Sequence, residues 1–110
     1  MSQELSSKLE LGWISAARLA QELCPDKVCA YYENALRLSP YSETALKGLA
    51  ETYRLKENFP QASEYLQRII STNPANGEAW GALGHCQLMM DDLSQAYASY
   101  QQGILSPFLH

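Results

Sequence analysis

The segment WGALGHCQLMMDDLSQAYASY, residues 80–100, carries the pattern that decides the fold. A large, an apolar and a small residue follow one another at helical spacing in Trp80-x2-Leu83-Gly84, and a small and an aromatic residue follow in Ala96-x3-Tyr100. The same pattern occurs earlier, in LKGLAETY at 46–53 and ASEYL at 62–66, at one constant offset along the chain. A fixed period of this kind indicates an internal repeat of one supersecondary unit.

The length of the period indicates which unit is repeated. A 34-residue period with this order of large, small and aromatic positions is that of the tetratricopeptide repeat (TPR), a helix-turn-helix unit. A less regular copy begins at Trp13, which lies one position closer to Leu46 than the period requires, so one residue is missing within it. The sequence predicts an all-α fold of three TPR repeats stacked as a right-handed superhelical solenoid. We divide it into an N-terminal tail at 1–8 and repeats at 9–42, 43–76 and 77–110, the last with a truncated or atypical C-terminal end.

Helix boundaries follow from capping residues and prolines. The first helix of each pair is predicted at about 9–23, 43–56 and 77–90, and the second at about 26–38, 60–72 and 93–105. Ser42 and Asn76 are good N-caps, Asp91 and Asp92 are candidates for the same role, and Pro60 suits a first helical turn. These pairs should bury a core that includes Trp13, Leu49, Tyr53, Leu83, Gly84 and Tyr100.

The C-terminal end of the predicted stack lacks the polar helix that usually caps such arrays. Several apolar side chains should therefore be left uncovered there, namely Leu93, Tyr97, Ile104, Phe108 and Leu109. Two interpretations fit this pattern. Either the sequence is a piece of a longer array, which we prefer, or another chain covers this end and the protein self-associates through it.

Composition disfavours several classes of function. The net charge is −4 and the eight Lys and Arg residues are scattered, which disfavours direct binding of nucleic acid. No apolar run approaches the roughly 20 residues that span a bilayer, and no secretory signal is recognisable. Three cysteines without a CxxC motif suggest reduced thiols inside the cell.

No catalytic constellation is recognisable, and neither a cofactor nor a metal is predicted. His85 and Cys86 are adjacent, but consecutive residues of a helix point in different directions and cannot act as base and nucleophile. Cys24 and Cys29 flank a turn without further ligands at metal-site spacing. We therefore expect a binding protein and not an enzyme.

The candidate site is the concave groove lined by the first helix of each pair. Helical phase places ten residues there: Leu11, Ile14, Arg18, Lys47, Glu51, Arg54, Glu78, His85, Leu88 and Met89. Such a mixed apolar and charged row suits an amphipathic helix of a partner protein. We expect most of the binding energy to come from four central residues, Ile14, Lys47, Leu88 and Met89. The three apolar ones among them should lie outside the helix face that packs against the core.

A more specific resemblance rests on three segments: WISAARLAQEL at 13–23, ALKGLAETYR at 45–54 and WGALGHCQLMMDDLSQAYASYQQGI at 80–104. Together they resemble the N-terminal TPR array of the fungal general transcriptional corepressor subunit that partners the Tup-type WD-repeat protein. A weaker resemblance is to the TPR region of UTX-type histone demethylases. Members of the corepressor family carry a longer array, and the residues after Gln102 no longer resemble it.

The resemblance implies a scaffold of a nuclear corepressor. Its first repeats would receive the helical N-terminal region of a Tup-type partner, and DNA-bound repressors would be contacted indirectly. The alternative is a generic intracellular TPR adaptor in a chaperone, ubiquitin-ligase or trafficking assembly, with a cytoplasmic location.

Overall fold

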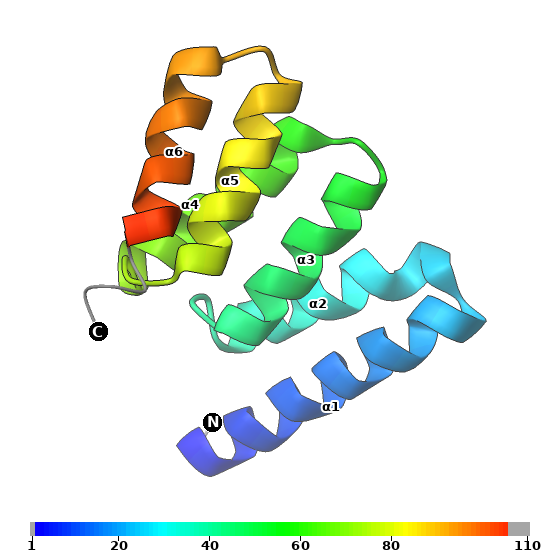
Figure 1. The fold of residues 1–110 in the computed structure, drawn as a ribbon. Coiled ribbons are helices and arrows are strands. Elements are labelled where there is room, and N and C mark those ends of the chain that lie inside the picture. The colour runs from blue at the N-terminus through cyan, green and yellow to red at the C-terminus, as the bar shows by residue number, and fades with distance from the viewer. Residues whose placement is uncertain (1, 106–110) are drawn as a thin grey trace.

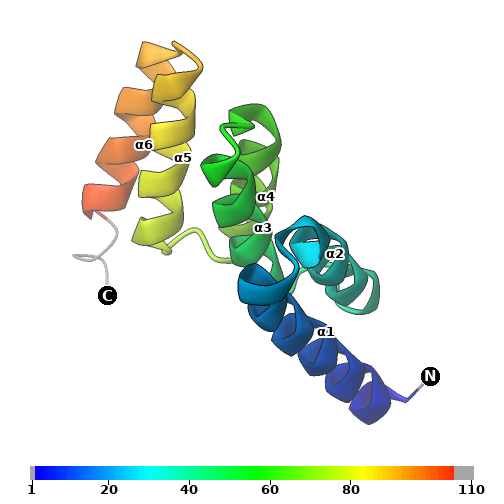
Figure 2. The same cartoon turned by 90° about the vertical axis from the view of Figure 1, so that its right-hand side faces the viewer.

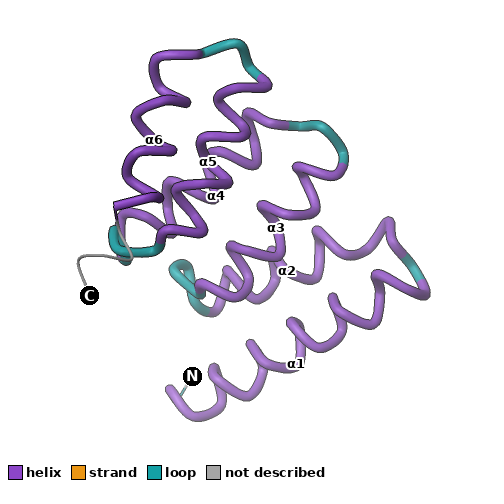
Figure 3. Tube along the Cα trace, viewed as in Figure 1, coloured by secondary structure: helices purple, strands orange, loops and turns teal. Residues whose placement is uncertain are grey.

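The structure is a computed structural model that describes residues 2–105. Within that range the chain forms six α-helices, one short 3-10 helix and no strand (Figures 1 and 3). The helices are α1 (Gln3–Leu23), α2 (Val28–Leu38), α3 (Glu43–Leu55), α4 (Phe59–Thr72), α5 (Gly77–Met89) and α6 (Leu93–Leu105), and η1 (Pro25–Lys27) lies between α1 and α2.

The helices pack as three consecutive pairs. Each helix contacts the next along the chain, with α1 against α2, α3 against α4, and α5 against α6, while α2–α3 and α4–α5 contacts join the pairs. Figure 2 shows α1 at one end of the row and α6 at the other. The predicted all-α stack of helix-turn-helix units is confirmed.

Local signals explain most of the helix ends. The Ser42 side chain accepts a hydrogen bond from the Ala45 amide at 3.4 Å, and Asn76 accepts one from the Ala79 amide at 3.0 Å. These are the N-cap contacts that the sequence predicted. Pro60 lies in the first turn of α4, where its missing N–H costs no intrahelical hydrogen bond.

The start of the first helix was predicted wrongly. α1 begins at Gln3, and the Ser2 hydroxyl caps it by accepting from the Leu5 amide at 3.2 Å. Residues 3–8, expected as a tail, are therefore helical. At the other end of this pair, Pro25 starts the 3-10 turn η1, and α2 begins only at Val28, two residues after the predicted start.

The turns within the second and third pairs share one geometry. Glu57 and Asp91, which lie one repeat period apart, both have positive φ angles, 60° and 62°. Asp91 therefore makes the left-handed turn, and its neighbour Asp92 caps α6 by accepting from the Gln95 amide at 3.3 Å. Of the two aspartates predicted as candidate caps, Asp92 has this role.

Small residues bring the helices of the core close together. Leu49, Leu83 and Gly84 are buried as predicted. Gly48 is the tightest position, because a Cβ atom there would lie 2.3 Å from Cζ of the buried Tyr32 ring on α2. Because Gly48 has no side chain, the Tyr32 ring of α2 can pack directly against the backbone of α3.

Three aromatic residues predicted as buried are only partly covered. Trp13 and Tyr53 are half-buried and pack against the edge of the core. Tyr100 is 37% exposed, because no helix follows α6 within the described range to cover it. The predicted uncovered end is visible at Leu93, Tyr97 and Ile104, which are all exposed. Phe108 and Leu109 lie outside the described residues.

Buried tyrosines make the fold sensitive to alkaline pH. Burial is the main cause that raises the pKa of Tyr32 and of Tyr65, and burial together with the nearby Cys29 thiol raises the pKa of Tyr53 to about 12. An unfolded tyrosine titrates near about 10. The folded chain then holds these protons more tightly than the unfolded chain, so their contribution to stability is present below about pH 10 and is lost as the pH rises towards about 12.

We therefore expect the urea midpoint of the chain to fall between about pH 8 and pH 11. Tyr53→Phe removes one of these three titrating tyrosines, so its urea midpoint should fall less over the same interval. An equal fall in the wild type and in Tyr53→Phe would show that Tyr53 does not contribute.

Candidate protein-binding groove

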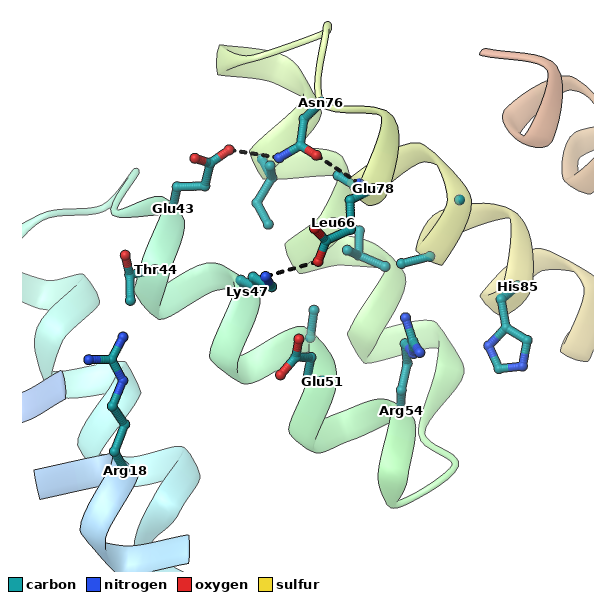
Figure 4. Close-up of a pocket in the computed structure, with 15 residues that line it drawn as sticks. Arg18, Glu43, Thr44, Lys47, Glu51, Arg54, Leu66, Asn76, Glu78 and His85 are labelled. Atoms are coloured by element: carbon teal, nitrogen blue, oxygen red, sulfur yellow. Dashed lines mark hydrogen bonds and ion pairs between the residues drawn. The ribbon is translucent and has the colours of Figure 1, made fainter. Parts of the chain in front are cut away.

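The first helices of the three pairs line an open groove of about 730 Å³ (Figure 4). α1 contributes Arg18 to it, while α4 contributes Leu66 and Ile69. The remaining lining residues come from α3, α5 and the residue that caps α5: Glu43, Thr44, Lys47, Ala50, Glu51, Arg54, Asn76, Glu78, Ala79, Gly81, Ala82 and His85. Small and aliphatic side chains are thus flanked by charged ones.

Helical spacing explains why α3 presents a polar row. Thr44, Lys47, Glu51 and Arg54 follow one another at intervals of three and four residues, so they lie on one face of the helix. On the facing helix α5, a Cβ atom added to Gly81 would meet nothing within 4 Å. The glycine leaves open space opposite the charged row, which a side chain of a partner can fill.

One end of the groove is held by polar contacts between α3 and α5. Lys47 and Glu78 form an ion pair with 2.9 Å between Nζ and Oε1, and the hydrogen bond to Glu78 is the main cause that raises the pKa of Lys47. Both side chains are mostly exposed, so this pair adds little stability. Glu43 accepts a hydrogen bond from Asn76 Nδ2 at 2.9 Å. These four side chains fix the rim and leave their outer atoms available to a ligand.

The other end contains polar atoms that are buried without a hydrogen bond. Within residues 2–105, Arg54 Nε and His85 Nδ1 have no hydrogen-bond partner. The His85 ring is held edge-on to Phe59 of α4, with 5.7 Å between ring centroids. An unsatisfied buried polar group costs about 1–3 kcal/mol. Both side chains line the groove, so a ligand whose binding turns these atoms towards it would recover part of this cost.

Arg18 and Glu51 lie near the buried Tyr32 hydroxyl, where α1, α2 and α3 meet. Burial is the main cause of the raised pKa of Tyr32, the Arg18 charge opposes it and the Glu51 charge adds to it. Counting every lining side chain, the groove carries three basic residues, Arg18, Lys47 and Arg54, and three acidic ones, Glu43, Glu51 and Glu78. Such a balanced lining suits a partner segment that carries both signs of charge.

The structure brings most of the predicted site residues together. Those that line the groove are Arg18, Lys47, Glu51, Arg54, Glu78 and His85. Leu11, Leu88 and Met89 are exposed but do not line it. Leu88 and Met89 belong to the last turn of helix α5. They lie beyond His85, which is the last residue of α5 that lines the groove.

The expected position of Ile14 is wrong. Ile14 is 3% exposed and belongs to the core with Ala17 and Ala20, which follow it at three-residue steps on the buried face of α1. Of the expected energetic centre, only Lys47 lies in the groove. The groove is consequently more polar than the sequence suggested.

Sequence reasoning missed part of the rim and the lining residues that α4 contributes. Asn76 was predicted only as an N-cap and Glu43 was not predicted in the groove, although Asn76 both caps α5 and donates a hydrogen bond to Glu43. Their separation in the sequence, close to the repeat period, was a usable signal that they are neighbours on adjacent first helices. Leu66 and Ile69 of α4 form part of the floor, which no pattern on the first helices could reveal.

Among the described side chains, no group of three or more His, Cys, Asp or Glu residues is placed to hold a metal ion. None of the helices within residues 2–105 has the length and apolar character needed to cross a membrane.

Comparison with known proteins identifies the repeat. The tetratricopeptide repeat family matches residues 55–106. The first TPR of Spaghetti (RPAP3), solved with an HSP90 peptide, superimposes with a TM-score of 0.82 at 16% identity, covering 91% of this chain and 80% of that one. The TPR domain of Arabidopsis FLU superimposes with a TM-score of 0.81 at 17% identity, covering 96% and 99%. The chain therefore has the fold of a TPR domain, and its residues 55–106 match the tetratricopeptide repeat family.

Two curated relatives of this chain are general transcriptional corepressors. It is 50% identical over 93 residues to the general transcriptional corepressor trfA of Dictyostelium discoideum, covering 84% of this chain and 7% of the relative. It is 47% identical over 103 residues to the general transcriptional corepressor ssn6 of Schizosaccharomyces pombe, covering 93% and 9%. The predicted resemblance to the corepressor family is confirmed, and the chain spans less than a tenth of the length of either relative.

Proposed function

We propose that this TPR chain is a protein-interaction scaffold of a general transcriptional corepressor and acts without catalysis in the nucleus. The observation that carries the proposal is the groove across α1, α3 and α5, in a chain homologous to corepressors. Its charged side chains flank small and aliphatic ones, which suits a protein segment. In this role the groove binds the helical N-terminal region of a Tup-type WD-repeat partner. DNA-bound repressors are reached indirectly, through the assembled complex.

The groove recognises such a helix by placing it along the charged row of α3. The exposed Lys47–Glu78 pair offers one charge of each sign at one end, so the partner's own charges set its direction. The Arg54 guanidinium lines the other end and donates to an acceptor of the partner, and the His85 ring lines the groove beside it. The small residues Gly81 and Ala82 accept an apolar side chain between them.

The exposed outer face of α6 is a second proposed contact surface. Leu93, Tyr97 and Ile104 are exposed there at spacings of four and seven residues, the pattern of a helix face that normally packs against a neighbour. A further helix pair of a longer array covers this face in our preferred interpretation, and self-association through it is the alternative.

A generic adaptor is the alternative function. The solved neighbour bound to an HSP90 peptide has the same fold at 16% identity, so a groove of this shape also serves other assemblies. In that case the chain uses the groove for a chaperone, ubiquitin-ligase or trafficking partner in the cytoplasm.

Calorimetric titration of the chain with the helical N-terminal region of a Tup-type protein tests the proposal. We expect saturable binding, and no heat of binding with an unrelated coiled-coil segment of equal length and net charge. Absence of binding to the Tup-type segment, together with capture of cytoplasmic assemblies in place of nuclear ones from whole-cell extract, would favour the generic adaptor.

A further inference from the structure

A face of α1 outside both the core and the groove carries an exposed apolar row. Leu5, Leu9, Leu19 and Leu23 are 48%, 42%, 65% and 76% exposed. Gly12 and Ala16 lie between them, and the six residues follow one another at steps of 4, 3, 4, 3 and 4. This is the a/d spacing of a coiled-coil helix. We call these six residues the α1 seam.

The α1 seam is not covered by any other helix within residues 2–105. It lies roughly 140° around the helix from Arg18, which faces the groove. Gly12 and Ala16 correspond, one repeat later, to Ala45 and Leu49 of α3, and both of those residues are fully buried beside the contact with α2. No helix among residues 2–105 takes the place of α2 on α1, which lies at the end of the row (Figures 1 and 2).

The order of residues in the seam is symmetric about the level of Ile14. Leu5 and Leu23 each lie nine residues from it, Leu9 and Leu19 five residues, and Gly12 and Ala16 two residues. If a second α1 helix lies antiparallel along the seam, every leucine meets a leucine and Gly12 meets Ala16. The small residues at the crossing point allow the two backbones to approach closely.

Charges beside the seam fit the same arrangement. Lys8 precedes Leu9 and Glu22 precedes Leu23, so both occupy the flanking g position of the heptad. In the antiparallel pair, Lys8 of one copy faces the partner copy's Glu22, and this contact occurs twice. Interhelical pairs at such positions select the partner and its direction. Within one copy, Lys8 makes only an exposed contact with Glu4 at 3.6 Å.

We propose that two copies of this chain associate through the α1 seam, antiparallel and about a twofold axis level with Ile14. The interface is self-complementary, as a twofold dimer requires. From Leu5 to Leu23 it extends over about 27 Å. Because the contact is short, the dimer is weak, with a dissociation constant on the order of 10 μM. Both grooves stay open, because Arg18 and the α3 and α5 walls face away from the seam.

Sedimentation velocity of the chain from about 1 to 200 μM tests the dimer. We expect a concentration-dependent shift from monomer to dimer, which the double variant Leu9→Glu/Leu19→Glu abolishes. Leu55→Glu is the matched control, because Leu55 is 86% exposed at the end of α3 and lies outside the seam. All three positions are at the surface, so circular dichroism should show an unchanged helix content.

A charge exchange tests the antiparallel register. Lys8→Glu places like charges opposite each other twice and should weaken the dimer at least about tenfold. Adding Glu22→Lys restores the opposite pairing and should restore the dimer. A wild-type chain that stays monomeric throughout the concentration series, or a charge exchange without rescue, would overturn the proposal. If Tyr97→Glu on α6 converts the dimer to monomer while the seam variants have no effect, the proposal is also overturned and self-association is assigned to α6.

Discussion

Gly48→Ala should destabilise the chain by about 2–3 kcal/mol, an unusually large cost for the addition of one methyl group. The added Cβ would lie 2.3 Å from Cζ and 2.6 Å from Cε2 of Tyr32. That ring is 4% exposed and packed between α2 and α3, so it cannot move aside without disturbing the contact between the first two repeats. Urea denaturation followed by circular dichroism measures the change in free energy of unfolding.

Two other glycines are matched controls for this prediction. Gly12→Ala meets no atom within 4 Å on the surface of α1, and it should stabilise the chain by up to about 1 kcal/mol through helix propensity. Gly84→Ala brings a Cβ to 3.1 Å from the Tyr100 ring, which is partly exposed and can shift, so its cost should be smaller than that of Gly48→Ala. Gly84→Leu, which adds four carbons at the same position, should cost about 1–3 kcal/mol. A neutral Gly48→Ala would show that α2 and α3 pack more loosely than described.

Arg54→Met should weaken binding of the Tup-type helical segment by roughly 2 kcal/mol, about thirtyfold. Arg54 Nε is buried without a hydrogen-bond partner within residues 2–105, so the free chain loses no Nε hydrogen bond when it is removed. Methionine retains the apolar stem that covers the groove wall. The thermal midpoint of the free chain should therefore stay the same or rise while the affinity falls.

Arg37→Met is the matched control for the groove prediction. Arg37 is exposed on α2 and does not line the groove, so the same change there should leave the affinity within about twofold of wild type. The opposite result for Arg54→Met, a lower thermal midpoint with unchanged affinity, would give Arg54 a structural role and remove it from the binding site.

The fold was predictable because three independent signals agree in the sequence. The constant repeat spacing, the caps at Ser42 and Asn76, and Pro60 each place a helix end where the structure has one. The first repeat was less predictable because its copy lacks one residue. Its α1 also extends to Gln3 under the Ser2 cap, a start that the repeat pattern does not encode.

The sequence predicted which face of the first helices lines the groove, but not how far the groove extends along them. Helical phase places Lys47, Glu51 and Arg54 on one side of α3, as the structure shows. Helical phase alone does not show how far the groove extends along α5. Leu88 and Met89 were therefore included, although His85 is the last residue of α5 that lines the groove. The same reasoning failed at Ile14, because the position that is exposed as Lys47 in the second repeat is buried in the first.

Backbone amide mapping by NMR, during titration with the helical N-terminal region of a Tup-type protein, shows directly whether the α3–α5 groove is the partner-binding surface. We expect chemical-shift changes to cluster along the facing rows of α3 and α5, at Lys47, Glu51, Arg54, Gly81 and His85, with α2 unaffected. Changes confined to the α1 seam or to the outer face of α6, with an unperturbed α3–α5 groove, would contradict it.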